Sequence, residues 1–356
     1  MPPGLDDDLP ARAYQKVTNA LSSELALSSE VSLTGMHSSA PAAFDRRAIP
    51  AEAVETRWRA RDGHAIRRID WLLPNGSPRG SLLFMPGRGD TYEKYLEVLD
   101  HWHRRGWRVT AADWRGQAGS GRLGLDAVTG HVDDFSLWVD DLADFWAQWR
   151  ESTPAPHVVV GHSMGGHLVL RALAEERIDP VAVVLSAPML GFNPGFVPCG
   201  VLHWLARQMA KLGDPRRPAW KWSEKPGALP EDRSDLLTHD PDRYADEQWW
   251  RDARPELVMG PASWGWVERA LASSQLLRQP SVLERIRTPV LMLATTRDRL
   301  VDYGAMERAA RRIPRAQLTR FGAEARHEIL READAVRDRA IAAVDDFLDR
   351  MAPIID

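Results

Sequence analysis

The sequence predicts an α/β fold in which helices cover both faces of a mostly parallel sheet. Apolar runs of strand length alternate along the chain with segments whose apolar residues recur at helical spacing. The apolar runs are of the continuous kind that is typical of parallel strands buried on both faces. A Gly-x-Ser-x-Gly pattern at 161–165 also stands where one such run passes into a helical segment.

Up to residue 190 the expected elements follow in a regular order. Two alternating segments around Asp62-Gly63, within residues 54–73, predict a β-hairpin. Expected strands follow at 80–87, 107–116, 157–163 and 181–189, and expected helices at 92–106, 132–149 and 165–176.

Between Leu190 and Arg287 the alternation stops. This stretch carries seven of the fifteen tryptophans: Trp204, Trp220, Trp222, Trp249, Trp250, Trp264 and Trp266. We interpret it as a helical lid insertion over the carboxyl ends of the strands, where open α/β sheets bind ligands. The alternative is a second structural lobe with its own core. The sheet pattern then resumes with strands expected at 288–296 and 317–322 and helices at 304–313 and 335–351.

These patterns divide the chain into four segments. Residues 1–50, rich in Ser, Ala, Pro and Asp, are expected to form a flexible or loosely docked arm. The first part of the core is expected at 51–190, the lid insertion at 191–287 and the second part of the core at 288–356.

Composition excludes several classes of protein. A formal net charge of −4 gives no electrostatic footprint for nucleic acid. The single cysteine, Cys199, excludes an internal disulfide framework, and no Cys/His cluster has the spacing of a metal site. We find neither a run of apolar residues long enough for a transmembrane helix nor a secretory signal at the N-terminus. The expected location is therefore the cytoplasm.

The Gly-x-Ser-x-Gly pattern makes Ser163 the candidate nucleophile. A serine hydroxyl needs a base, and the base needs an orienting acid. In hydrolases with this turn the acid and the histidine follow the serine in that order. Of the eleven histidines only His327 lies in a loop between the last expected strand and the last expected helix. Asp298 is the preferred acid, because Asp302 is expected to cap the next helix.

Acyl transfer also needs donors for a developing oxyanion. The backbone N–H of Met164, which follows the serine, is one candidate. The other is the backbone N–H of Arg88, in the glycine-containing loop 86–90 after the strand at 80–87. For the Arg88 side chain two interpretations stay open, contact with an anionic head group or simple solvation.

Several stretches together resemble the lysophospholipase/monoacylglycerol lipase group of α/β-hydrolases. They are MPGRGDTYEKY, ADWRGQAGSGR, GHVDDFSLWVDDLADFW, GHSMGGH, LSAPMLG, DRLVD and RHEIL, and the resemblance covers about residues 54–350. It implies an eight-strand hydrolase sheet with a helical lid. By position it matches Ser163, Asp298 and His327 to the family's nucleophile, acid and base, and Arg88 and Met164 to its oxyanion donors.

The resemblance further implies hydrolysis of single-chain acyl esters, either lysophospholipids or monoacylglycerols, without cofactor or metal. Two departures stand out, because Pro86-Gly87 replaces a usual His-Gly and Thr295 replaces the glycine usual before the acid. The alternatives are a generic carboxylesterase or acyltransferase with the same triad, and a non-catalytic protein that binds an acyl ligand. The expected partner is a small-molecule acyl ester. Peripheral contact with the inner face of the membrane through the Trp-rich lid is a hypothesis.

Overall fold

An eight-stranded sheet organises the computed structural model, which describes residues 44–72, 78–192, 199–220 and 231–353. The strand order is β1-β2-β4-β3-β5-β6-β7-β8. The strands are β1 (Ala53–Arg59), β2 (Ala65–Trp71), β3 (Gly80–Met85), β4 (Trp107–Ala112), β5 (His157–His162), β6 (Ala182–Ser186), β7 (Val290–Thr295) and β8 (Ala316–Phe321). Most of the arm expected at residues 1–50 lies outside the described residues, which begin at residue 44. Residues 45–356 form one compact unit.

The sheet is parallel from β4 to β8 and antiparallel at the β1 edge. β1 and β2 form the predicted hairpin, with Arg59 opposite Ala65, and Gly63 in the turn has a φ of 86°. β2 then pairs antiparallel with β4, while β4, β3, β5, β6, β7 and β8 pair in parallel. The carboxyl ends of the central strands therefore meet at one edge, where α/β folds place ligands.

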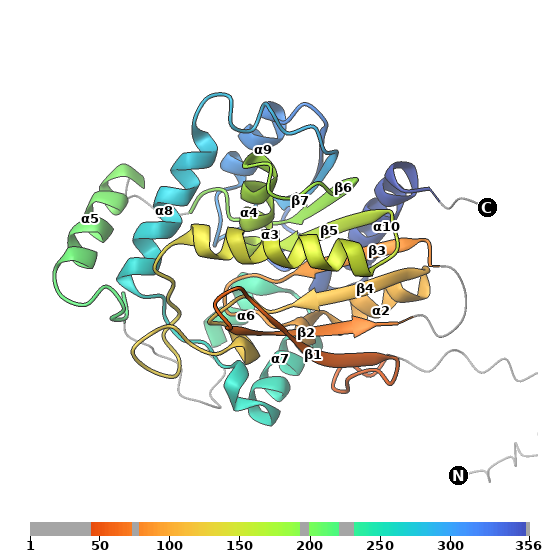
Figure 1. The fold of residues 1–356 in the computed structure, drawn as a ribbon, viewed down its shortest axis with the longest axis horizontal. Helices are drawn as coiled ribbons and strands as arrows, with labels where there is room; N and C mark the ends of the chain where they lie inside the picture. The colour runs from red at the N-terminus through yellow and green to blue at the C-terminus, as the bar shows by residue number, and fades with distance from the viewer. Residues whose placement is uncertain (1–43, 73–77, 193–198, 221–230, 354–356) are drawn as a thin grey trace, which may run out of the picture. The chain divides into compact units, whose positions relative to one another are not determined.

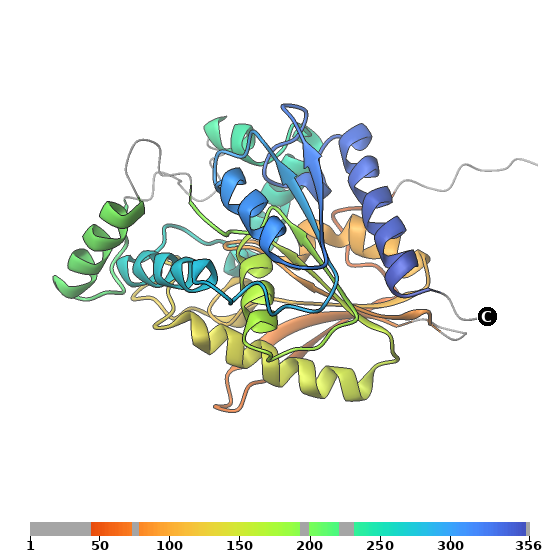
Figure 2. The ribbon, with the colours of Figure 1, turned by 90° about the horizontal axis from the view of Figure 1, so that it is seen from above.

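Helices cover both faces of the sheet, as the sequence predicts. Helices α2 (Leu96–Arg104) and α10 (Asp334–Met351) share one face, where the His101 ring lies 2.8 Å from an Asp345 carboxylate oxygen. Helices α3 (Phe135–Ser152), α4 (Ser163–Ala174) and α9 (Tyr303–Arg312) pack on the other face. Figure 2 shows α3 and α10 on opposite sides of the sheet.

Alternate residues of each central strand face the two layers. On β3, Leu83 belongs to the apolar cluster that includes α3, α4 and α9. Phe84 points the other way and packs on Tyr95, with ring centroids 4.6 Å apart. Successive side chains of a strand point to opposite faces of the sheet, so one short apolar run contributes to the apolar layers on both faces.

Some expected helices differ locally from the structure. The helix expected at 92–106 is a 3-10 turn, Tyr92–Tyr95, followed by α2. The helix expected from residue 132 begins at Phe135, because Asp134 accepts a hydrogen bond from the Ser136 backbone N–H (2.7 Å) and caps it. Further 3-10 turns are Ala118–Ser120, Pro255–Leu257 and Ile329–Arg331.

Between β6 and β7 the chain forms helices instead of continuing the sheet. They are α5 (Cys199–Lys211), α6 (Glu231–Leu237), α7 (Pro241–Ala253) and α8 (Trp264–Arg278). In Figure 1 α5 lies beside α8 at one side of the sheet, and His203 of α5 is 3.2 Å from Glu268 of α8. Of the seven tryptophans, Trp222 lies outside the described residues.

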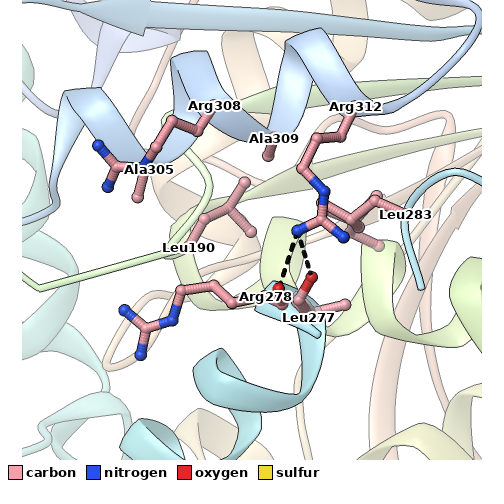
Figure 3. A pocket seen from close by; sticks show the side chains of 9 residues that line it. Leu190, Leu277, Arg278, Leu283, Ala305, Arg308, Ala309 and Arg312 are labelled. Atoms are coloured by element: carbon pink, nitrogen blue, oxygen red, sulfur yellow. Dashed lines mark hydrogen bonds between the residues drawn. The ribbon is translucent and has the colours of Figure 1, made fainter. Parts of the chain in front are cut away.

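The inserted helices return to the core where α8 ends. Arg312 of α9 donates hydrogen bonds to the backbone carbonyls of Leu277 (3.3 Å) and Arg278 (3.1 Å), as Figure 3 shows. A hollow of about 230 Å³ beside this contact is lined largely by leucine and alanine. The last turn of α8 has carbonyls without partners inside the helix, so Arg312 closes that end and fixes α8 to α9.

Candidate active site

Ser163 lies on a sharp turn between β5 and α4. β5 ends at His162 and α4 begins at Ser163, whose φ of 51° is unusual for a residue with a side chain. A Cβ atom on Gly165 would lie 2.3 Å from the carbonyl oxygens of Met85 and Pro86. The glycine is therefore required by the close approach of the loop after β3 to the start of α4.

The structure places His327 between the predicted nucleophile and the predicted acid. Its Nε2 is 2.9 Å from Ser163 Oγ and its Nδ1 is 2.8 Å from Asp298 Oδ2. Backbone N–H groups hold the His327 loop, because His327 donates to Leu236 O (3.3 Å) and Glu328 donates to Leu237 O (2.8 Å). The end of α6 thus fixes the loop that carries the imidazole.

The two aspartates that compete for the acid position have different surroundings. Asp298 is 6% exposed, and its Oδ1 accepts hydrogen bonds from the N–H groups of Leu300 (2.8 Å) and Val301 (3.0 Å). Asp302 instead caps α9 and accepts from the Gly304 N–H (2.8 Å). The Asp298 carboxylate faces the imidazole whereas Asp302 caps a helix, and Asp298 stays the predicted acid.

Burial and charge act in opposite directions on this pair. Burial alone would raise the pKa of Asp298, but the charge and hydrogen bond of His327, with two backbone N–H groups, lower it below its usual value. Burial alone would lower the pKa of His327, but the charge and hydrogen bond of Asp298 raise it above its usual value. An ionised aspartate that stabilises a charged imidazole is the arrangement a general base requires.

The loop 86–90 lies directly against the serine turn. A Cβ atom on Gly87 would be 3.0 Å from Ser163 Cβ. The Gly89 N–H donates to Gln117 Oε1 (2.8 Å), and the Trp114 indole N–H donates to Pro86 O (2.8 Å). The loop therefore sets the Arg88 backbone beside Ser163. On the other side Met164 is in the first turn of α4, where N–H groups have no carbonyl partner within the helix.

A pocket of about 270 Å³ opens onto Ser163 and His327. Its apolar lining comes partly from the core and partly from the inserted segment: Met189, Phe192, Trp220, Leu236, Leu237, Trp266, Leu300 and Val301. The Arg88 guanidinium also lines it, 5.2 Å from the Trp266 ring centre and 5.9 Å from that of Trp220, and donates to Gly260 O (2.9 Å). Apolar side chains therefore line much of the space next to Ser163.

Sequence reasoning missed a buried charged cluster beside Ser163 and His327. Lys94 Nζ is 2.6 Å from Asp90, 3.0 Å from Glu247 and 2.5 Å from Glu328. The Asp90–Lys94 spacing of four residues was its one local signal.

In the described part of the chain, the groups with metal-ligand spacing are Asp90, His162 and Glu328. The ammonium of Lys94 already bonds both of those carboxylates, so the donor set is that of an ion-pair cluster.

Comparison with known proteins places these features in a family. A family model described as serine aminopeptidase, S33, matches residues 76–334. Lysophospholipase L2 of Escherichia coli is 32% identical over 282 residues, which are 76% of this chain and 80% of that protein. Monoacylglycerol lipase of Mycolicibacterium smegmatis is 27% identical over 65% of this chain and 75% of that protein.

Solved structures agree on the fold. A soluble variant of monoglyceride lipase from Saccharomyces cerevisiae, in complex with a substrate analogue, superposes with a TM-score of 0.68 at 19% identity. The match covers 88% of this chain and 99% of that one. A thermostable carboxyl esterase from Bacillus coagulans gives 0.66 at 16% identity, over 85% and 100% of the two chains. At such identities the likeness shows an α/β-hydrolase fold, as the sequence predicts.

Proposed function

The chain belongs to the serine aminopeptidase S33 family, as a lysophospholipase- and monoacylglycerol-lipase-like α/β hydrolase, and from that premise we propose a reaction. It cleaves carboxylic esters of single-chain acyl lipids, lysophospholipids or monoacylglycerols, with Ser163, His327 and Asp298 as nucleophile, base and acid. One observation carries the proposal: a single imidazole spans Ser163 Oγ (2.9 Å) and Asp298 Oδ2 (2.8 Å) at the end of an apolar pocket.

The proposed mechanism begins with attack by Ser163 Oγ on the ester carbonyl carbon while His327 Nε2 takes the hydroxyl proton. The carbonyl oxygen becomes an oxyanion, which accepts hydrogen bonds from the backbone N–H groups of Arg88 and Met164. His327 then gives its proton to the leaving alkoxide, and the alcohol departs. Water activated by His327 hydrolyses the acyl-enzyme and releases the fatty acid.

The substrate class follows from the pocket and the relatives. Apolar side chains dominate the lining, and the two sequence relatives described above are named lysophospholipase and monoacylglycerol lipase. Four lining residues, Trp220, Leu236, Leu237 and Trp266, come from the insertion between β6 and β7. We therefore assign the insertion the role of a lid that forms one wall of the acyl site.

The test is fatty-acid release by the wild type, Ser163→Ala and Ser186→Ala. Ser186 ends β6 at the same sheet edge, and its buried hydroxyl has no hydrogen-bond partner among the described residues. Lysophosphatidylethanolamine, a monoacylglycerol, a short p-nitrophenyl ester and an aminoacyl p-nitroanilide are offered side by side. We expect release from the two lipids, a loss of about a million-fold in Ser163→Ala and no loss in Ser186→Ala.

Other outcomes redirect the assignment. Cleavage of the short ester alone leaves a generic esterase, and cleavage of the anilide alone indicates a peptidase. Ester formation with an added alcohol, in preference to hydrolysis, indicates an acyltransferase. Lack of turnover together with no labelling of Ser163 by a fluorophosphonate supports a protein that only binds acyl ligands.

Helix α5 supports a second proposal, contact with a membrane surface. Trp204 is 63% exposed, and the apolar side chains of Val201, Leu205 and Leu212 are exposed near it. Arg207 and Lys211 lie on the same helix. Apolar and basic side chains together are the composition that binds an anionic lipid interface. No helix among the described residues has the length and hydropathy of a membrane span.

Cosedimentation with phosphatidylglycerol/phosphatidylethanolamine vesicles tests this contact at low and moderate salt. We expect Trp204→Ser to lower the bound fraction severalfold. Trp249→Ser, which removes a 38% exposed tryptophan from α7 instead of α5, serves as the matched control. Equal binding by the two variants, or no binding by the wild type, contradicts the proposal.

A further inference from the structure

Lys94 is a buried cation that joins three separate parts of the chain. Its side chain is 3% exposed, and its three carboxylate partners are 8% exposed or less. Asp90 belongs to the loop of the proposed oxyanion donor, Glu328 follows the proposed base, and Glu247 belongs to α7 of the insertion. Burying an ammonium is costly unless it is paired. Such a cluster therefore forms only when all three segments are in place.

Asp90 links Lys94 to the backbone of the loop 86–90, which contains the proposed oxyanion donor. One carboxylate oxygen bonds Lys94, and the other accepts hydrogen bonds from the Gly87 N–H (3.1 Å) and the Tyr95 hydroxyl (3.0 Å). Burial alone would raise the pKa of Asp90, but the Lys94 charge lowers it to about 2, so the carboxylate is ionised. Gly87 stands directly before Arg88, and a glycine restricts its own backbone little. The direction of the Arg88 N–H is therefore set by such outside contacts.

Glu328 links Lys94 to the loop of the proposed base, His327. It follows His327 directly in the chain, and its Oε1 is 2.5 Å from Lys94 Nζ. The ring of His162, next to Ser163, contacts both sides: its centre is 4.9 Å from that of the His327 ring, tilted by 58°, and its Nε2 is 3.6 Å from Asp90. The His162 pKa is lowered to about 4 by burial, so this ring is neutral at pH 7. The cations that face the three carboxylates are Lys94, Arg331, which bonds Glu328, and Arg251, 2.7 Å from Glu247.

We propose that Lys94 and Asp90 are positioning residues, which hold the oxyanion donor loop and the base loop at a fixed separation. The inference rests on the proposed function, since it assigns the cluster a part in that reaction. Neither side chain reacts with the substrate. Their contribution is made in the transition state, when the oxyanion needs a donor in the right place.

Four variants test the proposal. Lys94→Met removes the charge and keeps most of the volume. Asp90→Ala removes the contact to Gly87, while Asp90→Asn keeps an oxygen that accepts its N–H. Arg67→Met is the matched control, because Arg67 is also buried and faces three carboxylates, Glu55, Glu93 and Asp113. None of these three belongs to the loop 86–90 or neighbours His327 in sequence.

Turnover is measured per active site, with sites counted by fluorophosphonate labelling. We expect kcat to fall about ten- to a hundredfold in Lys94→Met and Asp90→Ala, with KM within about twofold, as for a misplaced oxyanion donor. Asp90→Asn should recover part of that loss. Arg67→Met should lower the thermal midpoint and leave kcat per site unchanged. Equal kcat losses in Lys94→Met and Arg67→Met overturn the proposal, and so does an Asp90→Asn no better than Asp90→Ala.

Hydrogen exchange of the peptides covering 85–91 and 325–330 gives a readout independent of the substrate. We expect faster exchange in both peptides for Lys94→Met and unchanged exchange for Arg67→Met. If the wild type hydrolyses no ester through Ser163, the proposed function fails, and the exchange data still decide whether the cluster holds both loops. Should Lys94→Met fail to fold, the two Asp90 variants decide the point.

Discussion

Thr295 ties the loop of the proposed acid to the loop of the proposed base. Its hydroxyl lies 2.9 Å from the carbonyl oxygens of both Gly322 and Ala325, and it accepts a hydrogen bond from the Arg297 N–H (3.2 Å). Asp298 follows Thr295 in the first of these loops, and His327 follows Gly322 and Ala325 in the second. Thr295 stands where the related hydrolases usually have glycine, so in this chain a side chain provides a link that glycine lacks.

Replacing Thr295 by valine should therefore loosen the two loops. Valine has nearly the same shape but leaves buried carbonyls without a donor, which costs about 1–3 kcal/mol in the free energy of unfolding. We also expect kcat to fall severalfold. Urea unfolding and ester hydrolysis measure the two effects. Thr296→Val, at the exposed neighbouring position, should change neither, and equal effects from the two variants would contradict the assignment.

Asp298 and Asp302 offer a matched pair for the acid. Asp298→Asn keeps the shape but removes the charge that holds the imidazole tautomer, so kcat should fall by about ten-thousand-fold. Asp302→Asn should leave both kcat and the thermal midpoint nearly unchanged, because asparagine caps a helix as well as aspartate. Hydrolysis rates of the two variants, compared with the wild type, decide between the residues. A greater loss in Asp302→Asn would transfer the acid role to that residue.

The raised pKa of His327 predicts how activity varies with pH. The base must be neutral to accept the Ser163 proton, and the Asp298 charge stabilises the protonated ring, so its pKa lies above 6.5. The acid limb of kcat/KM should accordingly have its midpoint above that value, with activity lost as pH falls through it. In Asp298→Asn the residual activity should show a lower midpoint. A wild-type midpoint below 6.5 is incompatible with this environment of His327.

The order of elements could be predicted, and Ser163, Asp298 and His327 could be singled out, because their signals are local. Apolar runs set the strands, and the Ser163 turn depends on glycines next to it in sequence. Asp298 and His327 are each placed by a strand end, and parallel strands end at one edge. Those three residues accordingly come together in the structure.

The buried cluster could not be predicted in the same way. Lys94 and Glu328 are 234 residues apart, and a charged residue in a sequence is most often a solvated one. The tryptophans of the insertion posed a similar problem. Trp266 and Trp220 line the pocket, while Trp204 is exposed on α5. Composition shows that such side chains are present, but only the packing decides which of them reach the site.

The glycines provide the last prediction, which compares two alanine substitutions. In Gly165→Ala the new Cβ would lie 2.3 Å from two backbone carbonyl oxygens, of Met85 and Pro86. Backbone atoms of a central strand end move only at a cost, so we expect a loss of about 2 kcal/mol or more in stability. The displaced turn should also lower the rate at which a fluorophosphonate labels Ser163.

The control is Gly200→Ala, which places its Cβ on α5 with no heavy atom within 4 Å. There alanine should stabilise the protein by about 0.5 kcal/mol, because it lowers the conformational entropy of the unfolded chain. The labelling rate of Ser163 should be unchanged. Thermal unfolding and labelling rates measure both variants, and a tolerated Gly165→Ala would mean that the turn is less closely packed than the structure shows.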